Sequence, residues 1–169
     1  LYFIPTIIPL AAAAILWKWL LDGAWGLINY LLSILGINGP GWLTDPAWAK
    51  PALVLMNLWG AGQFVGIYLA GLQDVPTSLY EAAELDGASW WARMRFVTLP
   101  MISPLILYNV VMGMVNAFQY FVQPFIMTKG GPADSTLMYN LYLYNNAFLF
   151  FKMGYASAMA WILFAAIIV

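Results

Sequence analysis

The sequence predicts an all-α membrane protein, a polytopic helical bundle in a single domain without β-strands. Hydrophobic residues make up 64% of the 169 residues and charged residues only 8%, whereas about a quarter of the residues in soluble domains are charged. The apolar residues also gather in long runs, and a helix needs about 20 mostly apolar residues to cross the hydrocarbon core of a bilayer. Both observations place the chain in a membrane.

Four runs are long or apolar enough to be transmembrane spans, at about residues 1–21, 51–72, 101–127 and 154–169. We expect Pro5 and Pro9 to kink the first span. Trp17, Lys18 and Trp19 close it in the manner of an interfacial belt, with Lys18 free to snorkel. Pro51 suits the first turn of the second span. The chain begins at Leu1 and stops inside an apolar run, so we expect a fragment of a longer protein.

Two less apolar segments, 22–50 and 128–153, lie on one side of the predicted bundle. The stretch GLINYLLSILGI (26–37) is apolar but too short to span, which favours an interfacial or re-entrant helix. TKGGPADS (128–135) predicts a turn, after which Asp134 or Ser135 can cap a helix. Residues 137–152 mix aromatic and amide side chains, so we expect an amphipathic helix at the membrane surface.

The segment 73–100 is the polar interruption of the chain. It holds six charged residues, namely Asp74, Glu81, Glu84, Asp86, Arg93 and Arg95. Charged side chains are costly in hydrocarbon, so this segment must project into water. Its side of the membrane is opposite to that of 22–50 and 128–153.

Helix signals divide this segment into two short helices. Pro76 suits a first turn, and Ser78 with Glu81 has the spacing of a capping box. Gly87, after Asp86, is the natural place for a turn. A second helix is expected from about Ser89 to Val97, stopped by Pro100, with an apolar side for the membrane spans formed by Trp90, Trp91 and Phe96.

Composition excludes several functions. The net charge is −1 and no basic patch is present, which argues against a nucleic-acid partner. Cysteine and histidine are both absent, which removes disulfides, thiol nucleophiles, imidazole bases and the usual zinc ligands. We therefore expect no catalytic residues and no metal site. An intramembrane enzyme working through carboxylates has little support, because the predicted spans hold no Asp or Glu.

Polar residues recur at helical spacing on the third span: Asn109, Gly113, Asn116, Tyr120 and Gln123, with Gln119 at the edge. On the second span one face holds Asn57, Ala61, Phe64, Tyr68 and Gly71. Amides beside aromatic rings suit a sugar, so these faces predict a watery translocation path. The alternative is that the amides only join helices by hydrogen bonds.

The spacing within 81–100 carries a family resemblance. EAA (81–83), Gly87, Val97 and Leu99-Pro100 resemble the EAA signature of permease subunits in binding-protein-dependent ABC importers, with Val97 where isoleucine is common. LQDVPTSLYEAAELDGAS (72–89), PGWLTDP (40–46) and MGYASAMAW (153–161) resemble the sugar-importer branch. TKGGP (128–132) is similar to the maltose-type first permease subunit.

The resemblance implies a type I ABC importer permease fold and a mechanism. The segment 73–100 would form cytoplasmic coupling helices seated in a cleft of an ATPase subunit, and closure of two ATPase subunits would rock the bundle from inward-facing to outward-facing. The residues implied in coupling are Glu81, Ala82, Ala83, Asp86, Gly87, Leu99 and Pro100. Further implied partners are a second permease subunit in a heterodimer, an extracytoplasmic solute-binding protein, a sugar and the lipid bilayer. ATP and Mg²⁺ would be used by the ATPase, with no cofactor on this chain.

The resemblance also bears on the path. It places Asn116 and Tyr120 on the face similar to the sugar-contacting face of maltose-type permeases, and NLW (57–59) is similar to their second-span motif. Relatives often carry an acidic residue where this chain has Val122. The candidate substrate path is Asn57, Trp59, Asn109, Asn116, Gln119, Tyr120 and Gln123.

Localisation and orientation follow from the resemblance, which implies a multi-pass protein of the bacterial or archaeal cytoplasmic (inner) membrane. The count of basic residues points the other way, because Arg93 and Arg95 lie in 73–100 whereas Lys50, Lys129 and Lys152 lie opposite. Two alternatives remain: an importer for another solute, such as an amino acid or phosphate, and a structural membrane protein in which 73–100 is a linker.

Overall fold

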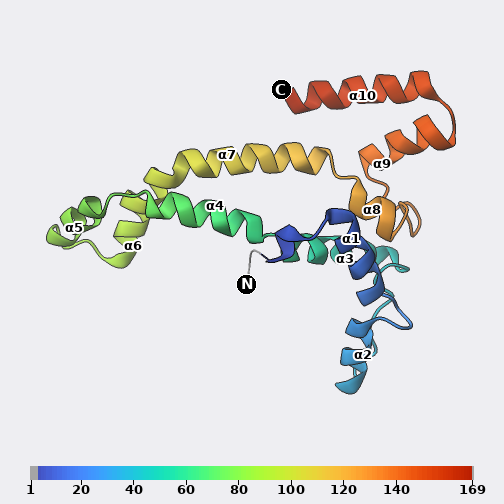
Figure 1. Cartoon of the computed structure of the whole chain (residues 1–169), viewed down its shortest axis with the longest axis horizontal. Helices are drawn as coiled ribbons and strands as arrows, with labels where there is room; N and C mark the ends of the chain where they lie inside the picture. The colour runs from blue at the N-terminus through green and yellow to red at the C-terminus, as the bar shows by residue number, and fades with distance from the viewer. Residues whose placement is uncertain (1–3, 169) are drawn as a thin grey trace. The chain divides into compact units, whose positions relative to one another are not determined.

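The computed structural model describes residues 4–168, which form helices joined by turns, with no β-strand in this range. Figure 1 shows the helices in chain order. Their bounds are α1 (Leu10–Leu20), α2 (Leu27–Ile34), α3 (Pro46–Trp59), α4 (Gly62–Gln73), α5 (Thr77–Leu85), α6 (Trp90–Arg93), α7 (Leu99–Phe118), α8 (Val122–Met127), α9 (Tyr139–Tyr144) and α10 (Met153–Ile168). A 3₁₀ turn (Ile4–Ile7) and two π-helical turns (Met94–Thr98 and Asn145–Leu149) complete them.

These residues divide into two compact units. Of the described residues, the first unit holds 4–6 and Ala61–Met114, and the second holds Ile7–Gly60 and 115–168. Each unit is described by itself.

The first unit contains α4, α5, α6 and the start of α7. In Figure 1, α5 and α6 lie at the end where α4 finishes and α7 begins. Gly71 of α4 faces Leu105 of α7, because a Cβ at this position would overlap Leu105 Cδ2. The absent side chain of the glycine leaves room for the Leu105 side chain.

Helix α5 begins where expected, but its N-terminus is not formed by the predicted capping residues. Pro76 occupies the N-cap position rather than the first turn, and no side chain caps the helix, so the Ser78–Glu81 capping box is not formed. The fixed φ of Pro76, −59°, leads the chain directly into the helix.

Pro100 does not stop the second helix of residues 73–100, called the coupling segment below after the role that the resemblance implies. This corrects the prediction. The chain runs from α6 through the π-helical turn Met94–Thr98 into α7, which contains Pro100 in its first turn. In the π turn the Leu99 N–H bonds to Met94 O, five residues back. Proline lacks an N–H and excludes the carbonyl four residues before it, and a locally widened turn lets a helix continue through such a site.

The second unit has its core where α1, α3 and α8 meet. Its buried residues are Ala13, Ala14, Trp17, Leu21, Ala52, Leu53, Met56 and Met127. Trp17 is buried and its ring meets that of Trp59 edge-on, with 6.0 Å between the centroids. The prediction that Trp17 belongs to an interfacial belt is therefore wrong, because helix packing has taken it into the core.

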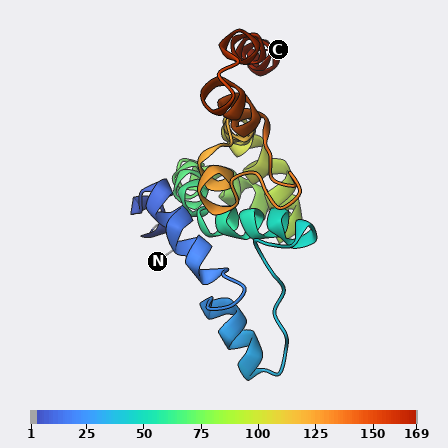
Figure 2. The same ribbon diagram turned by 90° about the vertical axis from the view of Figure 1, so that its right-hand side faces the viewer.

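Two helix boundaries in the second unit also differ from prediction. Helix α3 begins at Pro46, with Asp45 as its N-cap, so Pro51 lies inside the helix rather than in its first turn. After the turn at 128–136, α9 begins at Tyr139 with Met138 as N-cap, and neither Asp134 nor Ser135 caps it. Helix α2 forms within the stretch expected, and Figure 2 shows it beyond the end of α1, with a long loop leading back to α3.

By length and composition, Trp90–Met127 is the one helical stretch of residues 4–168 that could cross a membrane, and the bent pair Pro46–Trp59 and Phe64–Gln73 would make a second. The helices within the predicted spans 1–21 and 154–169 are shorter, at Leu10–Leu20 and Met153–Ile168. The four spans and the sides assigned to the segments between them stay predictions, and residues 1–3 and 169 lie outside the described part.

Candidate functional site

The coupling segment presents α5 to solvent. Glu81 and Ala82 are exposed, Ala83 is half-buried, and Leu85 is 90% exposed. Small side chains beside exposed carboxylates leave the backbone of α5 open to close approach by another surface. Asp86 closes the helix as its C-cap and is exposed as well.

Gly87 ends α5 in a Schellman motif. Its φ is +73°, the Gly87 N–H bonds to Glu84 O at 3.0 Å, and the Ala88 N–H bonds to Ala83 O at 2.9 Å. Left-handed backbone favours glycine, since a Cβ there costs roughly 1–2 kcal/mol. No atom lies within 4 Å of the position a Cβ would take, so backbone conformation, not space, requires glycine. The predicted turn at Gly87 is confirmed.

The turn after Gly87 leads into α6, which continues through the π turn into α7. Ser89 accepts a hydrogen bond from the Ala92 N–H, at 3.3 Å, and starts α6. Leu99 and Pro100 are exposed at the beginning of α7. The coupling residues predicted from sequence thus lie on one short assembly, α5, its C-terminal turn and the entry to α7.

Two side-chain contacts attach α5 to the following segment. The Tyr80 hydroxyl lies 2.9 Å from the Thr98 hydroxyl, and Arg93 Nη1 lies 3.7 Å from Glu84 Oε2. Tyr80 and Glu84 are four residues apart and so share one face of α5. The sequence analysis missed Tyr80 and Thr98; the adjacency of Tyr80 to Glu81 is the signal that could have drawn attention to them.

The apolar side predicted for the second helix does not pack within the described structure. Trp90, Trp91 and Phe96 are 58%, 73% and 73% exposed. The two tryptophan rings meet edge-on with centroids 4.8 Å apart, and Arg95 lies over the Phe96 ring. These rings pack on their sequence neighbours rather than on a helix of the chain.

In the second unit, three of the predicted path residues form a hydrogen-bonded trio. The Asn57 amide donates to Tyr120 Oη at 2.9 Å, and the Gln123 amide donates to Asn57 Oδ1 at 3.3 Å. Gln123 is 7% exposed, whereas Asn57 remains exposed. Asn57 on α3 thus bonds both to Tyr120, just before α8, and to Gln123, in the first turn of α8. The trio can serve both as a helix contact and as a polar surface.

The remaining path residues are not joined to this trio. Asn109 is 8% exposed and donates to Leu105 O of its own helix at 2.9 Å. Asn116 and Gln119 are exposed, and Trp59 packs on Trp17.

The predicted continuous polar faces are broken. Helix α7 ends at Phe118 and α8 begins at Val122, so the residues from Asn109 to Gln123 do not share one helix. Likewise Asn57 belongs to α3, Ala61 lies in the break at 60–61, and Phe64, Tyr68 and Gly71 belong to α4.

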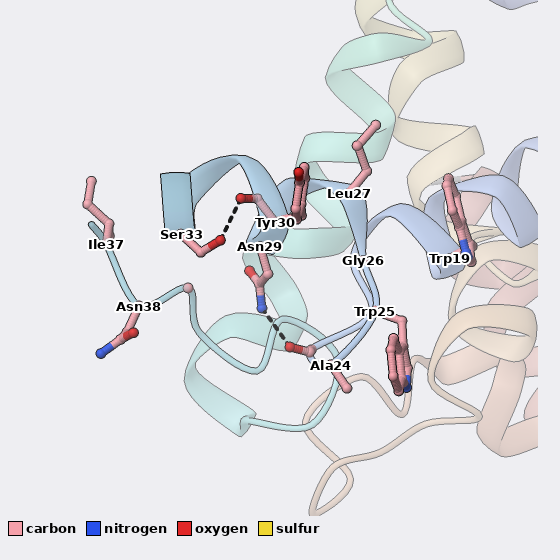
Figure 3. Close-up of a pocket in the computed structure, with 12 residues that line it drawn as sticks. Trp19, Ala24, Trp25, Gly26, Leu27, Asn29, Tyr30, Ser33, Ile37 and Asn38 are labelled. Carbon is pink, nitrogen blue, oxygen red and sulfur yellow. Dashed lines mark hydrogen bonds between the residues drawn. The ribbon is translucent and has the colours of Figure 1, made fainter. Parts of the chain in front are cut away.

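A groove of about 540 Å³ lies between α2, the end of α1 and the loop after α2. Figure 3 shows Trp19, Trp25 and Tyr30 around it, and none of the predicted path residues lines it. This groove was not among the sites predicted from the sequence, since its walls come from α1, α2 and the segments beside them and follow no single pattern.

Asn29 fixes the shape of this loop. Its amide donates to Gly23 O and Pro40 O, at 3.0 and 3.1 Å, and its oxygen accepts from Trp42 Nε1 at 2.7 Å. At the start of the loop, the N–H groups of Trp25 and Ala24 bond to Asp22 and lower the pKa of its carboxyl. The amide of Asn29 and the carboxylate of Asp22 are thus engaged in holding the loop.

Among the residues that the structure describes, no group of three or more acidic side chains is placed to hold a metal ion. The cofactor and metal predictions stay predictions.

Comparison with known proteins agrees with this architecture. The family model of the binding-protein-dependent transport system inner membrane component matches residues 1–169. Over 96% of its length the chain is 43% identical to the probable ABC transporter permease protein YesP of Bacillus subtilis, of which it covers 54%. It is 38% identical to the sulfoquinovosyl glycerol transport system permease protein SmoG of Agrobacterium fabrum, covering 53% of that protein.

A solved structure has the same fold. The crystal structure of a bacterial alginate ABC transporter in complex with an alginate pentasaccharide-bound periplasmic protein matches with a TM-score of 0.88 and 25% identity, over 98% of this chain and 58% of that chain. The predicted all-α permease fold is confirmed. The chain spans about half the length of the curated relatives it matches. It belongs to the family of binding-protein-dependent transport system inner membrane components.

Proposed function

We propose that the chain is part of the permease subunit of an ATP-driven importer for a sugar or oligosaccharide. The observation that carries this proposal is the coupling segment: an exposed helix α5 with the EAA residues is closed by Gly87 and followed by α6, which is continuous with the long helix α7 through the π turn. A soluble ATPase subunit can bind such a helix and, by moving it, displace α7. A segment that served only as a solvated linker would not need an exposed helix connected to α7 in this way. The chain itself is non-catalytic, and ATP with Mg²⁺ binds to the separate ATPase subunits.

The sugar class is supported by two relatives. One transports sulfoquinovosyl glycerol by its name, and the solved relative was crystallised with an alginate pentasaccharide on its periplasmic protein. We propose the same set of partners here: a second permease subunit, two ATPase subunits, an extracytoplasmic solute-binding protein and the lipid bilayer. The candidate path residues are amide and aromatic side chains without charge, which suit the hydroxyl groups and C–H faces of a sugar.

The Gly87→Pro variant tests the coupling role. Proline cannot adopt φ +73° and lacks the N–H that bonds to Glu84 O. In proteoliposomes containing the full transporter, we expect solute uptake to be abolished while membrane insertion of the subunit is unchanged. Uptake and binding-protein-stimulated ATP hydrolysis are measured together.

Gly36→Pro is the matched control. Gly36 ends α2 with φ +74°, and the bonds of its N–H to Ser33 O and of the Ile37 N–H to Leu32 O form the same motif. The local damage is therefore equal, but it lies outside the coupling segment. Normal uptake and ATPase stimulation in the Gly87→Pro variant would refute the docking role.

A further inference from the structure

The buried end of the coupling segment carries a polar contact that needs an explanation. Thr98 is the last residue of the π turn and directly precedes Leu99-Pro100, yet its side chain is polar and the residue is only 5% exposed. A buried hydroxyl is costly unless it is hydrogen-bonded. Its partner is the Tyr80 hydroxyl, at 2.9 Å, from the residue next to Glu81 on α5.

Either hydroxyl can donate in this contact. The Thr98 hydroxyl also lies 3.5 Å from Arg93 O. These contacts run from α5 to the carbonyl before the π turn, and the Arg93 side chain also reaches Glu84 on the same face of α5.

The opposite side of α5 stays free. Tyr80 and Glu84 face the π turn, whereas Glu81, Ala82 and Leu85 are exposed. In the Glu84–Arg93 pair the Glu84 side chain is 72% exposed and the Arg93 side chain 29%, so solvent screening weakens this ion pair. Of the two contacts that attach α5 to the following segment, the Tyr80–Thr98 hydrogen bond is the more buried one.

We propose that the Tyr80–Thr98 hydrogen bond is the positioning link that makes α5 and the start of α7 move as one body, so that a displacement of α5 reaches the membrane bundle. This inference rests on the proposed function. Tyr80 and Thr98 are positioning residues: they act on α7 through the π turn and touch neither the solute nor ATP. A π-helical turn at this place fits the role, since such turns concentrate at functional sites.

The first test removes single hydroxyl groups in the complete transporter. For Tyr80→Phe and Thr98→Val we expect the ATPase subunits to copurify in normal amounts, while the solute taken up per ATP hydrolysed falls by about fivefold, the factor expected for one net hydrogen bond. The double variant should be no worse than either single variant, because both lose the same bond. Thr98→Ser keeps the hydroxyl and should retain the wild-type ratio.

Tyr108→Phe is the control for loss of a phenol, since Tyr108 lies on α7 and is 57% exposed. An unchanged ratio of uptake to hydrolysis in Tyr80→Phe and Thr98→Val would overturn the inference. Loss of ATPase copurification in these variants would also overturn it, because the bond would then only shape the docking surface.

A second test does not depend on the stability of the single variants. The chain has no cysteine, so Tyr80→Cys and Thr98→Cys can be combined, with partner cysteines replaced, and joined by a short bifunctional thiol reagent. We expect cross-linking to restore the uptake lost in the double cysteine variant. If the cross-link leaves uptake low, α5 and α7 do not act as one body.

The Gly87→Pro variant separates a failure of this inference from a failure of the proposed function. If Gly87→Pro also leaves transport intact, the proposed function itself fails. If only the Tyr80 and Thr98 variants behave as wild type, this inference alone fails.

Discussion

At the scale of single residues, the polar side chains of the second unit are engaged in pairs and trios. Asn57, Tyr120 and Gln123 are joined by two hydrogen bonds across sequence separations of 63 and 66 residues. Within membranes such bonds between helices contribute about 0.6 kcal/mol on average. The trio therefore joins α3 to α8, and its exposed member Asn57 is the one that can also meet a solute.

Replacing Asn57 with leucine tests both roles. The variant removes both bonds and leaves the buried Gln123 amide without this partner, so we expect the free energy of unfolding to fall by about 1–2 kcal/mol. Thermal unfolding of the purified subunit measures this loss. Tyr120→Phe, which spares the Gln123 bond, should lose less. A change in the KM for solute uptake, beyond the stability loss, is expected if Asn57 lines the path; unchanged melting would contradict the structural role.

Thr136 is a fully buried and hydrogen-bonded residue of the turn at 128–136. It is fully buried, its hydroxyl donates to Gly131 O at 2.7 Å, and it lies 2.6 Å from the Thr128 hydroxyl. Thr136→Val keeps the shape but removes both contacts, so that Gly131 O loses this donor, while the Thr128 hydroxyl keeps only its bond to Pro124 O. We expect a loss of about 2 kcal/mol in stability, seen as a lower melting temperature. The exposed Ser157 gives a control, Ser157→Ala; equal melting of the two variants would contradict this account.

At the scale of elements, the contact between α1 and α8 depends on small residues. Ala13 and Ala14 are 4% and 0% exposed, and Met127 from α8 belongs to the same cluster. Alanine on the facing side lets helix backbones come close, and dispersion between them then stabilises the pair.

Ala14→Leu should overpack this contact and destabilise the unit by about 1–3 kcal/mol. Ala12→Leu, on the exposed side of the same helix, adds the same volume without a clash and is the control. Thermal unfolding in detergent and the yield of folded protein report the difference. An Ala14→Leu variant as stable as Ala12→Leu would show that α1 is not held by close packing.

The elements also show where sequence patterns fail. Proline was expected to end a helix at Pro100, but a π turn carries the helix through it. Regular spacing predicted one polar face along 109–123, but the break at 119–121 interrupts it. A polar face is predicted from regular spacing only on the assumption that the helix is unbroken. The local sequence does not determine in which direction the side chains point after a break.

At the scale of the whole molecule, we expect residues 73–100 to face the cytoplasm and residues 22–50 to lie on the other side of the membrane, and this orientation can be tested by labelling. Asn38 lies in the loop after α2 and Asp86 closes α5, and both are exposed. Since the chain has no cysteine, Asn38→Cys and Asp86→Cys each introduce one thiol to it. In intact cells, a membrane-impermeant thiol reagent should label position 38 and should label position 86 only after the membrane is opened. Labelling of position 86 from outside would refute both the orientation and the coupling role.

The sequence by itself determined the class of the protein and the turn at Gly87, because long apolar runs with few charges suit a membrane and left-handed backbone favours glycine wherever the rest of the chain lies. Only the tertiary structure decided that Trp17 is buried against Trp59, that Asn57 meets Tyr120 and Gln123, and that Tyr80 bonds to Thr98. These contacts join residues 18 to 66 positions apart. They depend on helix breaks and packing, and no local pattern contains that information.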